Sequence, residues 1–171
     1  LGNKTEILSL GKELGLANIE KAEIINPAES DKRASYVDLL VELRKSKGLT
    51  REEAEELVNN PLYYGCLMVK AHDADGFVAG AINYTKDVLR PALQIIKTKP
   101  GIKCVSGAFL LFTKSQYGDN GFVLVADVAV TPRPSAQEMA EIAICSAETA
   151  RDVCGIDPRV ALLSYSTMGS G

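Results

Sequence analysis

The stretch DADGFVAGAINYTKDVLRPALQIIKT, residues 73–98, decides the fold class. Its apolar segment between Gly76 and Gly80 predicts a short buried strand, and the polar residues that follow predict a turn. Thr85 opens a run to Lys97 in which apolar residues recur at helical spacing. The expected apolar face of this helix consists of Leu89, Leu93 and Ile96. A strand, a polar turn and a helix in this order form the repeating unit of an α/β protein.

Downstream of this unit the same alternation continues. The apolar segments 103–112 and 121–130 predict two strands that flank a polar turn. Ser135 is placed to cap a helix that extends to about Val153. The segment 159–166 then predicts a last strand.

Upstream, the pattern predicts four helices and one further strand. The helices cover residues 5–14, 30–47, 50–58 and 61–72, and the strand covers residues 21–27. Thr5 is the expected cap of the first helix, and Thr50 opens the third with a capping box. Helices and strands that alternate along the chain predict an α/β sheet with helices on its faces.

The composition is that of a globular protein and excludes two classes of partner. The chain has 171 residues, of which 46% are hydrophobic and 24% are charged, and its formal net charge is −3. A general nucleic-acid coat would be basic. The apolar runs are far shorter than the ~18 residues that a membrane span requires. We therefore expect neither nucleic acid nor a membrane as a partner.

The cysteines indicate reduced thiols rather than a metal site. They stand at positions 66, 104, 145 and 154 without a CxxC pair, and His72 is the single histidine. No ligand spacing for zinc is present, so we expect no metal. Each cysteine lies in an apolar stretch, which predicts buried thiols and a cytoplasmic location.

Two arginines are candidates for holding an anion. Arg90 lies about a turn and a half into the helix of the opening stretch, and open α/β sheets bind ligands beyond the carboxyl ends of their strands. Its guanidinium would form a permanently charged, two-pronged clamp for phosphate. Arg44 belongs to a basic cluster with Lys45 and Lys47 at a predicted helix C-terminus. Interaction with the helix dipole explains that cluster without any function, and a solvated surface charge is the plain alternative for Arg90.

A hydroxyl-rich turn follows the last predicted strand. It contains Ser164, Ser166 and Thr167 and is rich in glycine. Hydroxyl and backbone N–H groups suit an anion, although the sequence matches neither the Walker A pattern nor GxGxxG. An ordinary strand-to-helix turn is the alternative interpretation.

Asp127 lies within an apolar segment and needs a structural explanation. An isolated buried carboxylate is costly. We therefore expect Asp127 to be paired, to act as a cap, or to stand at the end of its strand.

Six segments occur in a distinctive order across nearly the whole chain. They are ELRKSKGLT, YYGCLMVKAHDADGFVAGA, DVLRPALQIIKT, YGDNGFVLVADVAV, EIAICSAETA and RVALLSYSTMGSG. In this order and spacing they resemble the phosphate acetyltransferase (phosphotransacetylase) family. The family enzyme is longer, and both ends of this sequence look cut, so the resemblance implies an internal piece.

The resemblance implies a specific architecture. It is a three-layer α/β/α protein of the isocitrate/isopropylmalate dehydrogenase-like kind, with two domains, a cleft between them, and a homodimeric assembly. This chain would cover part of it. Residues 1–101 would form a partial first α/β domain, and residues 102–171 the N-terminal half of the second.

The resemblance also implies a reaction and its substrates. The family moves an acetyl group reversibly between coenzyme A and inorganic phosphate, with acetyl phosphate as the other partner. Attack is direct, in a ternary complex with no acyl-enzyme and no tightly bound cofactor.

By similarity, Arg90 and Arg44 match substrate-binding arginines, Arg90 for phosphate or acetyl phosphate and Arg44 for coenzyme A or phosphate. The hydroxyl residues that match positions lining the site are Thr85, Ser164, Ser166 and Thr167. The family's base, an aspartate with serine and arginine neighbours, has no counterpart here. We therefore expect no catalytic residue within the chain, which alone would be inactive.

Two other functions fit the same segments. A phosphate acyltransferase for a longer acid, such as butyrate, would share the fold and the anion clamps. A non-catalytic module that senses acyl-CoA, similar to the C-terminal part of bifunctional malic enzymes, would share much of the sequence. The helix DVLRPALQIIKT resembles the transferase more closely.

Overall fold

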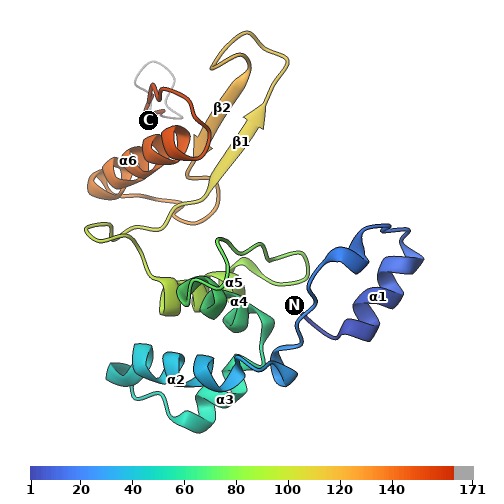
Figure 1. Cartoon of the computed structure of the whole chain (residues 1–171). Helices are drawn as coiled ribbons and strands as arrows, with labels where there is room; N and C mark the ends of the chain where they lie inside the picture. The colour runs from blue at the N-terminus through green and yellow to red at the C-terminus, as the bar shows by residue number, and fades with distance from the viewer. Residues whose placement is uncertain (164–171) are drawn as a thin grey trace. The chain divides into compact units, whose positions relative to one another are not determined.

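The computed structural model of the chain describes residues 1–163. The chain divides into two compact units, Leu1–Lys97 and Thr98–Gly171. Figure 1 shows helices in the first unit and a two-stranded sheet with one long helix in the second. Helices and strands together agree with the α/β class. That these units are parts of two family domains, at 1–101 and 102–171, stays a prediction.

The first unit is built from α-helices joined by short helical turns. The α-helices are α1 (Lys4–Glu13), α2 (Arg33–Arg44), α3 (Arg51–Val58), α4 (Pro61–Lys70) and α5 (Thr85–Pro91). The turns are η1 (Ile19–Lys21), η2 (Pro27–Glu29), η3 (Lys45–Lys47) and the π-helical η4 (Ala92–Ile96). All the helices predicted in this unit are confirmed, with ends shifted by a few residues.

The helix caps explain two of these starts. Thr50 and Glu53 form the predicted capping box, in which the Glu53 N–H donates to Thr50 Oγ1 over 3.2 Å and the Thr50 N–H donates to Glu53 Oε2 over 2.9 Å. The prediction that Thr5 caps α1 is wrong. Asn3 caps it instead, because its side-chain oxygen accepts from the N–H groups of Thr5 (2.9 Å) and Glu6 (3.2 Å).

The core of this unit lies where α2, α3, α4 and η4 meet. Helices α2 and α3 bury side chains that recur at helical spacing. The core side chains are Tyr36, Val37, Leu40, Ala54, Val58, Tyr63, Tyr64, Cys66, Leu67 and Ile95. The helix predicted at residues 61–72 is confirmed as α4, whose residues from Leu62 to Leu67 are all buried.

The buried face of the α5–η4 segment differs from the prediction. Pro91 and Ile95 are buried, whereas Leu93 and Ile96 are 46% and 38% exposed. Pro91 has no N–H to donate to the preceding turn, and the chain widens into a π-helical turn in which the Lys97 N–H donates to the Ala92 carbonyl over 2.9 Å. This change of period turns a different face towards the core.

Two predicted strands of this unit are not formed. Residues 21–27 form parts of helical turns and an irregular segment, and residues 76–82 are irregular. Val78 and Ile82 are 98% and 95% exposed, so the second segment is not buried either. A strand needs a neighbour to pair its N–H and C=O groups, and neither segment pairs with another strand in the described chain.

The second unit contains a β-hairpin and a long helix. Strands β1 (Ala108–Phe112) and β2 (Phe122–Ala126) pair antiparallel, with Phe112 opposite Phe122. Helix α6 (Ala136–Asp152) packs beside β2 (Figure 1). Ser135 caps α6 with a capping box, as predicted. The sheet within the described residues has this single pair and no parallel strands.

The last predicted strand is not seen in the part that can be described. Residues 159–163 are irregular, and Leu163 is 87% exposed. The rest of that predicted strand and the turn after it lie outside the described residues. In residues 1–163, no helix is long and apolar enough to cross a membrane.

Candidate functional site

Arg90 projects from the short helix that the opening stretch forms. It lies in the last turn of α5, directly before Pro91, and its side chain is exposed. No ion pair or side-chain hydrogen bond within residues 1–163 engages its guanidinium. An arginine in this state has all its donors available for an anion.

Arg44 comes from a different element of the same unit. It is the last residue of α2, where the chain passes into η3, and it is half-buried. Gly48 closes this segment with a left-handed backbone, φ 74°. Lys45 and Lys47 are exposed. No carboxylate in the described residues pairs with Arg44.

The charges of the two arginines both act on one tyrosine. Tyr63 of α4 is 9% exposed, and burial raises the pKa of its hydroxyl, while the positive charges of Arg90 and then Arg44 lower that pKa. Both arginines therefore contribute to the positive charge around this tyrosine, and neither has a carboxylate partner among the described residues. Positive charge without a paired carboxylate favours an anion.

Gln94 completes the contacts of this tyrosine. The Tyr63 hydroxyl donates a hydrogen bond to Gln94 Oε1 over 3.0 Å. Gln94 is half-buried in η4, four residues after Arg90, and side chains at that spacing share one helix face. Hence α5–η4 presents a charged donor and a neutral acceptor side by side. We call Arg44, Tyr63, Arg90 and Gln94 the arginine cluster.

Of the predicted hydroxyl residues, Thr85 lies in the part of the chain that the structure describes. Thr85 is the first residue of α5 and is exposed. It stands about 140° around the helix from Arg90, since an α-helix turns about 100° per residue. The residues Ser164, Ser166 and Thr167 lie outside the described residues.

Asp127 has a structural role within the second unit. It stands directly after β2, and its carboxylate accepts from the N–H groups of Gly107 (2.9 Å), Ala129, Val130 (3.2 Å each) and Thr131. Burial raises the pKa of Asp127, but these backbone donors outweigh it and lower the pKa. The expectation that it acts as a cap at the strand's end is confirmed, and its oxygens are occupied.

The cysteines do not form a nucleophilic site. Burial raises the pKa of Cys66 to about 11, so its thiol stays protonated at neutral pH. The prediction of buried thiols holds for Cys66 and is wrong for Cys104, Cys145 and Cys154, which are partly exposed. In residues 1–163, no cluster of His, Cys, Asp and Glu could hold a metal ion.

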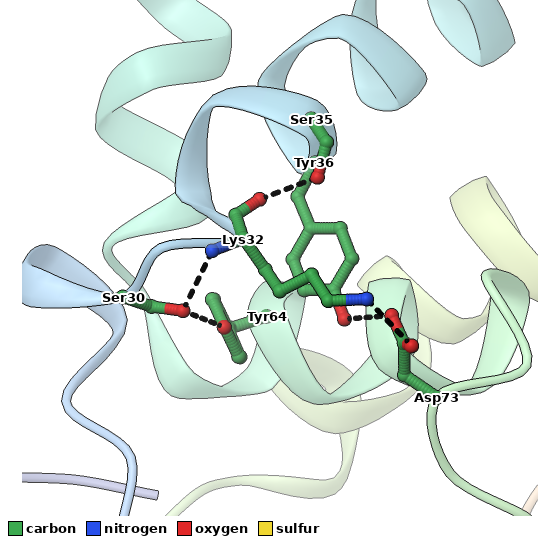
Figure 2. A network of polar contacts seen from close by, with 6 residues as sticks. All are labelled: Ser30, Lys32, Ser35, Tyr36, Tyr64 and Asp73. Carbon is green, nitrogen blue, oxygen red and sulfur yellow. Dashed lines mark hydrogen bonds and ion pairs between the residues drawn. The ribbon is translucent and has the colours of Figure 1, made fainter.

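A second polar cluster lies near the start of α2 and is fully paired. Figure 2 shows Lys32 and Tyr36 converging on the two oxygens of Asp73, over 2.8 and 2.6 Å. Ser30 and Tyr64 face each other with 2.5 Å between their hydroxyl oxygens. Because these groups satisfy one another, the cluster holds the end of α4 against α2 and offers no free group to a ligand.

Two members of the arginine cluster, Tyr63 and Gln94, are not among the residues that the sequence predicts for the site. Tyr63 stands in a segment that is apolar on nearly all sides, and this pattern favours a core residue. The spacing of four residues between Arg90 and Gln94 was the available signal. The partner of Gln94 lies 31 residues earlier in the chain, and no local pattern identifies it.

Comparison with known proteins gives concordant results. A family model described as phosphate acetyl/butaryl transferase matches residues 1–171. The chain is 50% identical, over 99% of its length, to a protein named phosphate acetyltransferase from Thermoanaerobacterium thermosaccharolyticum. It is 48% identical to the protein of the same name from Clostridium acetobutylicum. The chain covers 51% of each, so it spans about half the length of these curated relatives.

Solved structures agree with the sequence comparison. The EutD phosphotransacetylase from Staphylococcus aureus matches 99% of this chain with a TM-score of 0.83 and 45% identity. A phosphotransacetylase from Streptococcus pyogenes matches with the same TM-score and 44% identity. The chain covers 49% and 50% of these structures.

Proposed function

Because the chain belongs to the phosphate acetyl/butaryl transferase family, we propose that the complete protein is a phosphate acetyltransferase. It would catalyse acetyl-CoA + phosphate = acetyl phosphate + CoA. The observation that carries this proposal is the 50% identity to a phosphate acetyltransferase over 99% of the chain. The two arginines of the arginine cluster have no carboxylate partners in the described residues, and their charges suit such anionic substrates.

The reaction requires two anionic partners to be held in line. The coenzyme A thiolate attacks the acetyl carbonyl carbon, a carbon–sulfur bond forms, and the carbon–oxygen bond to phosphate breaks. The thiol proton passes to a base, since a free thiol with a pKa of about 8.5 is mostly protonated at neutral pH. Positioning of the substrates and stabilisation of charge therefore contribute most of the rate acceleration.

We assign Arg90 to phosphate or acetyl phosphate and Arg44 to coenzyme A or phosphate. The hydroxyl residues proposed to line the site are Thr85, Ser164, Ser166 and Thr167. No residue of this chain matches the aspartate base of the family. The carboxylates of Asp127 and Glu141 accept hydrogen bonds from backbone N–H groups, which engage their oxygens. We therefore propose that the chain binds anions but needs a base from outside these residues.

The finer features implied by the family belong to the same proposal. They are the three-layer, isocitrate/isopropylmalate dehydrogenase-like fold with two domains, a homodimer, and a cytoplasmic location without a tightly bound cofactor. The TM-score of 0.83 to two phosphotransacetylases supports the fold. Size measurements on the complete protein test the dimer.

A direct experiment tests the reaction and its acyl group. The complete protein is assayed for phosphate-dependent release of coenzyme A from acetyl-CoA and from butyryl-CoA. We expect acetyl-CoA to be the better substrate. Faster turnover of butyryl-CoA would assign the protein to butyryl transfer, and binding of acetyl-CoA without turnover would assign it to the sensing modules.

A further inference from the structure

The two compact units of the chain are joined at a strained residue. The first unit ends with Lys97, and the second begins with Thr98. Lys97 has a φ of 69° and a ψ of −178°. This combination is almost restricted to glycine, and a residue with a Cβ atom keeps it only where the surrounding structure imposes it. The attachments of the chain on both sides of Lys97 supply that constraint.

On its N-terminal side, Lys97 is fixed to the first unit. Its N–H donates to the Ala92 carbonyl over 2.9 Å, which closes the π-helical turn η4. Ile95 in the same turn is fully buried in the core of this unit. The Lys97 side chain is exposed and makes no ion pair in residues 1–163. The constraint on Lys97 therefore acts through its backbone.

On the C-terminal side, a carboxylate of α6 fastens the chain to the second unit. Glu141 Oε2 accepts from the N–H groups of Lys103 over 2.9 Å and of Cys104 over 3.0 Å. Glu148, two turns further along α6, pairs with Lys99 over 3.1 Å, but an exposed ion pair of this kind contributes little to stability. The chain is therefore attached firmly from Lys103 onwards and only weakly at Lys99.

Between these attachments the chain has few bonds. The backbone N–H of Thr98 donates to no acceptor in residues 1–163, and its side chain makes no hydrogen bond there. The next backbone bond, from the Ile102 N–H to the Lys99 carbonyl over 3.1 Å, closes a local turn. Rotation about the backbone of Lys97 and Thr98 therefore leaves the attachments on both sides intact.

We propose that Lys97 is the hinge residue about which the two units change their relative orientation, and that Glu141 keeps this hinge short. Hinges are a few loop or element-terminal residues that absorb large changes in φ and ψ. Lys97 ends η4 and releases strain when its backbone rotates. Without Glu141, the weakly held stretch would extend to Val105, whose carbonyl accepts from Thr131 Oγ1 over 3.0 Å. This inference does not depend on the proposed function.

The test measures motion between the units of the complete protein by time-resolved energy transfer between two dyes. The dyes are attached through unnatural amino acids at the exposed positions of Glu52 in α3 and Arg151 in α6, so the native cysteines stay unlabelled. Hinge motions take microseconds to milliseconds, far longer than a donor lifetime, and the fluorescence decay therefore gives the distribution of distances between the dyes. Amide hydrogen exchange and the melting temperature are measured for the same proteins.

Two substitutions at Lys97 differ by one methyl group. Glycine adopts the backbone of this position without strain and has more conformational freedom, whereas alanine keeps the Cβ atom and removes only the charged chain. We expect Lys97→Gly to broaden the distance distribution and Lys97→Ala to leave it as in the wild type. A wild-type distribution in Lys97→Gly, or equal broadening in both variants, would show that the backbone of Lys97 is not the hinge.

His72 controls for the release of strain as such. It also has a positive φ, 61°, but it lies inside the first unit, shortly after the end of α4. His72→Gly should leave the distance distribution unchanged. Equal broadening in His72→Gly and Lys97→Gly would mean that glycine loosens the protein generally, and the assignment to Lys97 would be wrong.

Variants of Glu141 test the attachment that limits the hinge. Glu141→Ala removes the acceptor for Lys103 and Cys104, so exchange at these two amides should accelerate about 5- to 150-fold. The distance distribution should broaden at the same time. Glu141→Gln keeps a neutral acceptor oxygen and should show both effects more weakly. It carries the test if the melting temperature shows that Glu141→Ala does not fold.

Glu148→Gln is the matched variant on the same helix. It removes one carboxylate charge from α6 and weakens only the exposed pair with Lys99. Exchange at Lys103 and Cys104 should stay at the wild-type rate, and the distance distribution should broaden less than in Glu141→Ala. Faster exchange in Glu141→Ala without a broader distribution, or equal broadening in Glu148→Gln, would refute the role of Glu141.

These measurements need no turnover, so the hinge and the proposed function fail separately. A protein without transferase activity in which only Lys97→Gly and the Glu141 variants broaden the distribution would keep the hinge and refute the proposed function. A protein with normal transferase activity and no broadening in Lys97→Gly would keep the function and refute the hinge.

Discussion

Tyr36 and Asp73 are joined by a hydrogen bond of 2.6 Å, which links the first turn of α2 to the segment that follows α4. Lys32 pairs with the other oxygen of Asp73 over 2.8 Å. The hydrogen bond from Lys32, followed by that from Tyr36, lowers the pKa of Asp73. A stabilising carboxylate at this place makes the first unit sensitive to acid.

The sign of the pH effect follows from that lowered pKa. In the unfolded chain an aspartate titrates near about 3.9, so between this value and the lower folded pKa the unfolded state binds more protons. The contribution of Asp73 to the free energy of unfolding is complete above the pKa that it has in the unfolded chain. This contribution is lost as the pH falls through its pKa in the folded protein. We expect the gap in urea midpoint between wild type and Asp73→Asn to be constant from pH 7 to 5 and to close in stronger acid.

Asp75 provides the matched control for this prediction. It lies two residues along, is exposed, and makes no side-chain hydrogen bond or ion pair among the described residues. Asp75→Asn should leave the midpoint unchanged at every pH. A gap for Asp73→Asn that persists undiminished in strong acid would show that its charge does not stabilise the fold.

The second prediction concerns the clamp role of Arg90. Arg90→Ala in the complete protein should lower kcat/KM for phosphate or acetyl phosphate at least ~10-fold, since a charge-assisted bidentate contact contributes more than ~1.4 kcal/mol. Arg90→Lys should recover only part of the loss, because an ammonium group cannot form the two-pronged contact. Steady-state kinetics with each substrate varied in turn measure both effects.

Lys86 tests whether charge alone explains that result. It lies on the same helix, one turn before Arg90, is exposed, and approaches the Tyr84 ring at 5.6 Å. Lys86→Ala removes the same charge from α5 and should leave kcat/KM within about twofold at moderate ionic strength. Equal losses for the two variants would indicate a general electrostatic field instead of a clamp.

The helices were predictable because their signals are local. Thr50 and Glu53 stand three residues apart, and Ser135 and Glu138 repeat the pattern, so the starts of α3 and α6 could be identified from short windows. The core face of α2 followed from spacing in the same way. Such elements need no knowledge of distant residues.

The strands and the arginine cluster depend on residues that are distant in the sequence. The segment containing Val78 has strand-like composition, yet in the described structure it has no neighbouring strand and is exposed. Arg90 and Arg44 could be selected as candidates from their own segments, whereas the hydrogen bond between Tyr63 and Gln94 joins residues 31 apart and could not be predicted. The composition of a buried helix does not show which partner the hydroxyl of a buried tyrosine meets.

The third prediction concerns close packing at Gly65 of α4. A Cβ atom at this position would lie 2.3 Å from Cε2 of the Phe77 ring, so an alanine there must displace the ring. Overpacking of this kind costs about 1–3 kcal/mol, of which the better helix propensity of alanine returns up to about 1 kcal/mol. We expect Gly65→Ala to lower the urea midpoint.

Gly76 supplies the comparison for Gly65. A Cβ at Gly76 would meet no atom within 4 Å, so Gly76→Ala should be neutral or slightly stabilising through the unfolded state. Phe77→Leu combined with Gly65→Ala should recover part of the loss, because the smaller side chain leaves room for the methyl group. Equal midpoints for Gly65→Ala and wild type would mean that the Phe77 ring moves aside without cost.

The fourth prediction concerns the loop that Asp127 organises after β2. In Asp127→Asn, the amide nitrogen that replaces Oδ2 would face the N–H of Thr131, so a donor would meet a donor. The loss of a charge-assisted contact to backbone donors should cost about 1–3 kcal/mol. Amide hydrogen exchange at Val130 and Thr131 should accelerate by about 5- to 150-fold, in keeping with that cost.

Asp119 shows why this effect should be specific to Asp127. It is exposed in the hairpin turn of the same unit, and its carboxylate receives one contact of 3.3 Å, from the side chain of Asn120. Asp119→Asn should therefore leave the exchange rates at Val130 and Thr131 unchanged. Similar rates in Asp127→Asn and wild type would show that the loop is held by its bonds to Val105 and Gly107 alone, such as the 3.0 Å bond from Thr131 Oγ1 to the Val105 carbonyl.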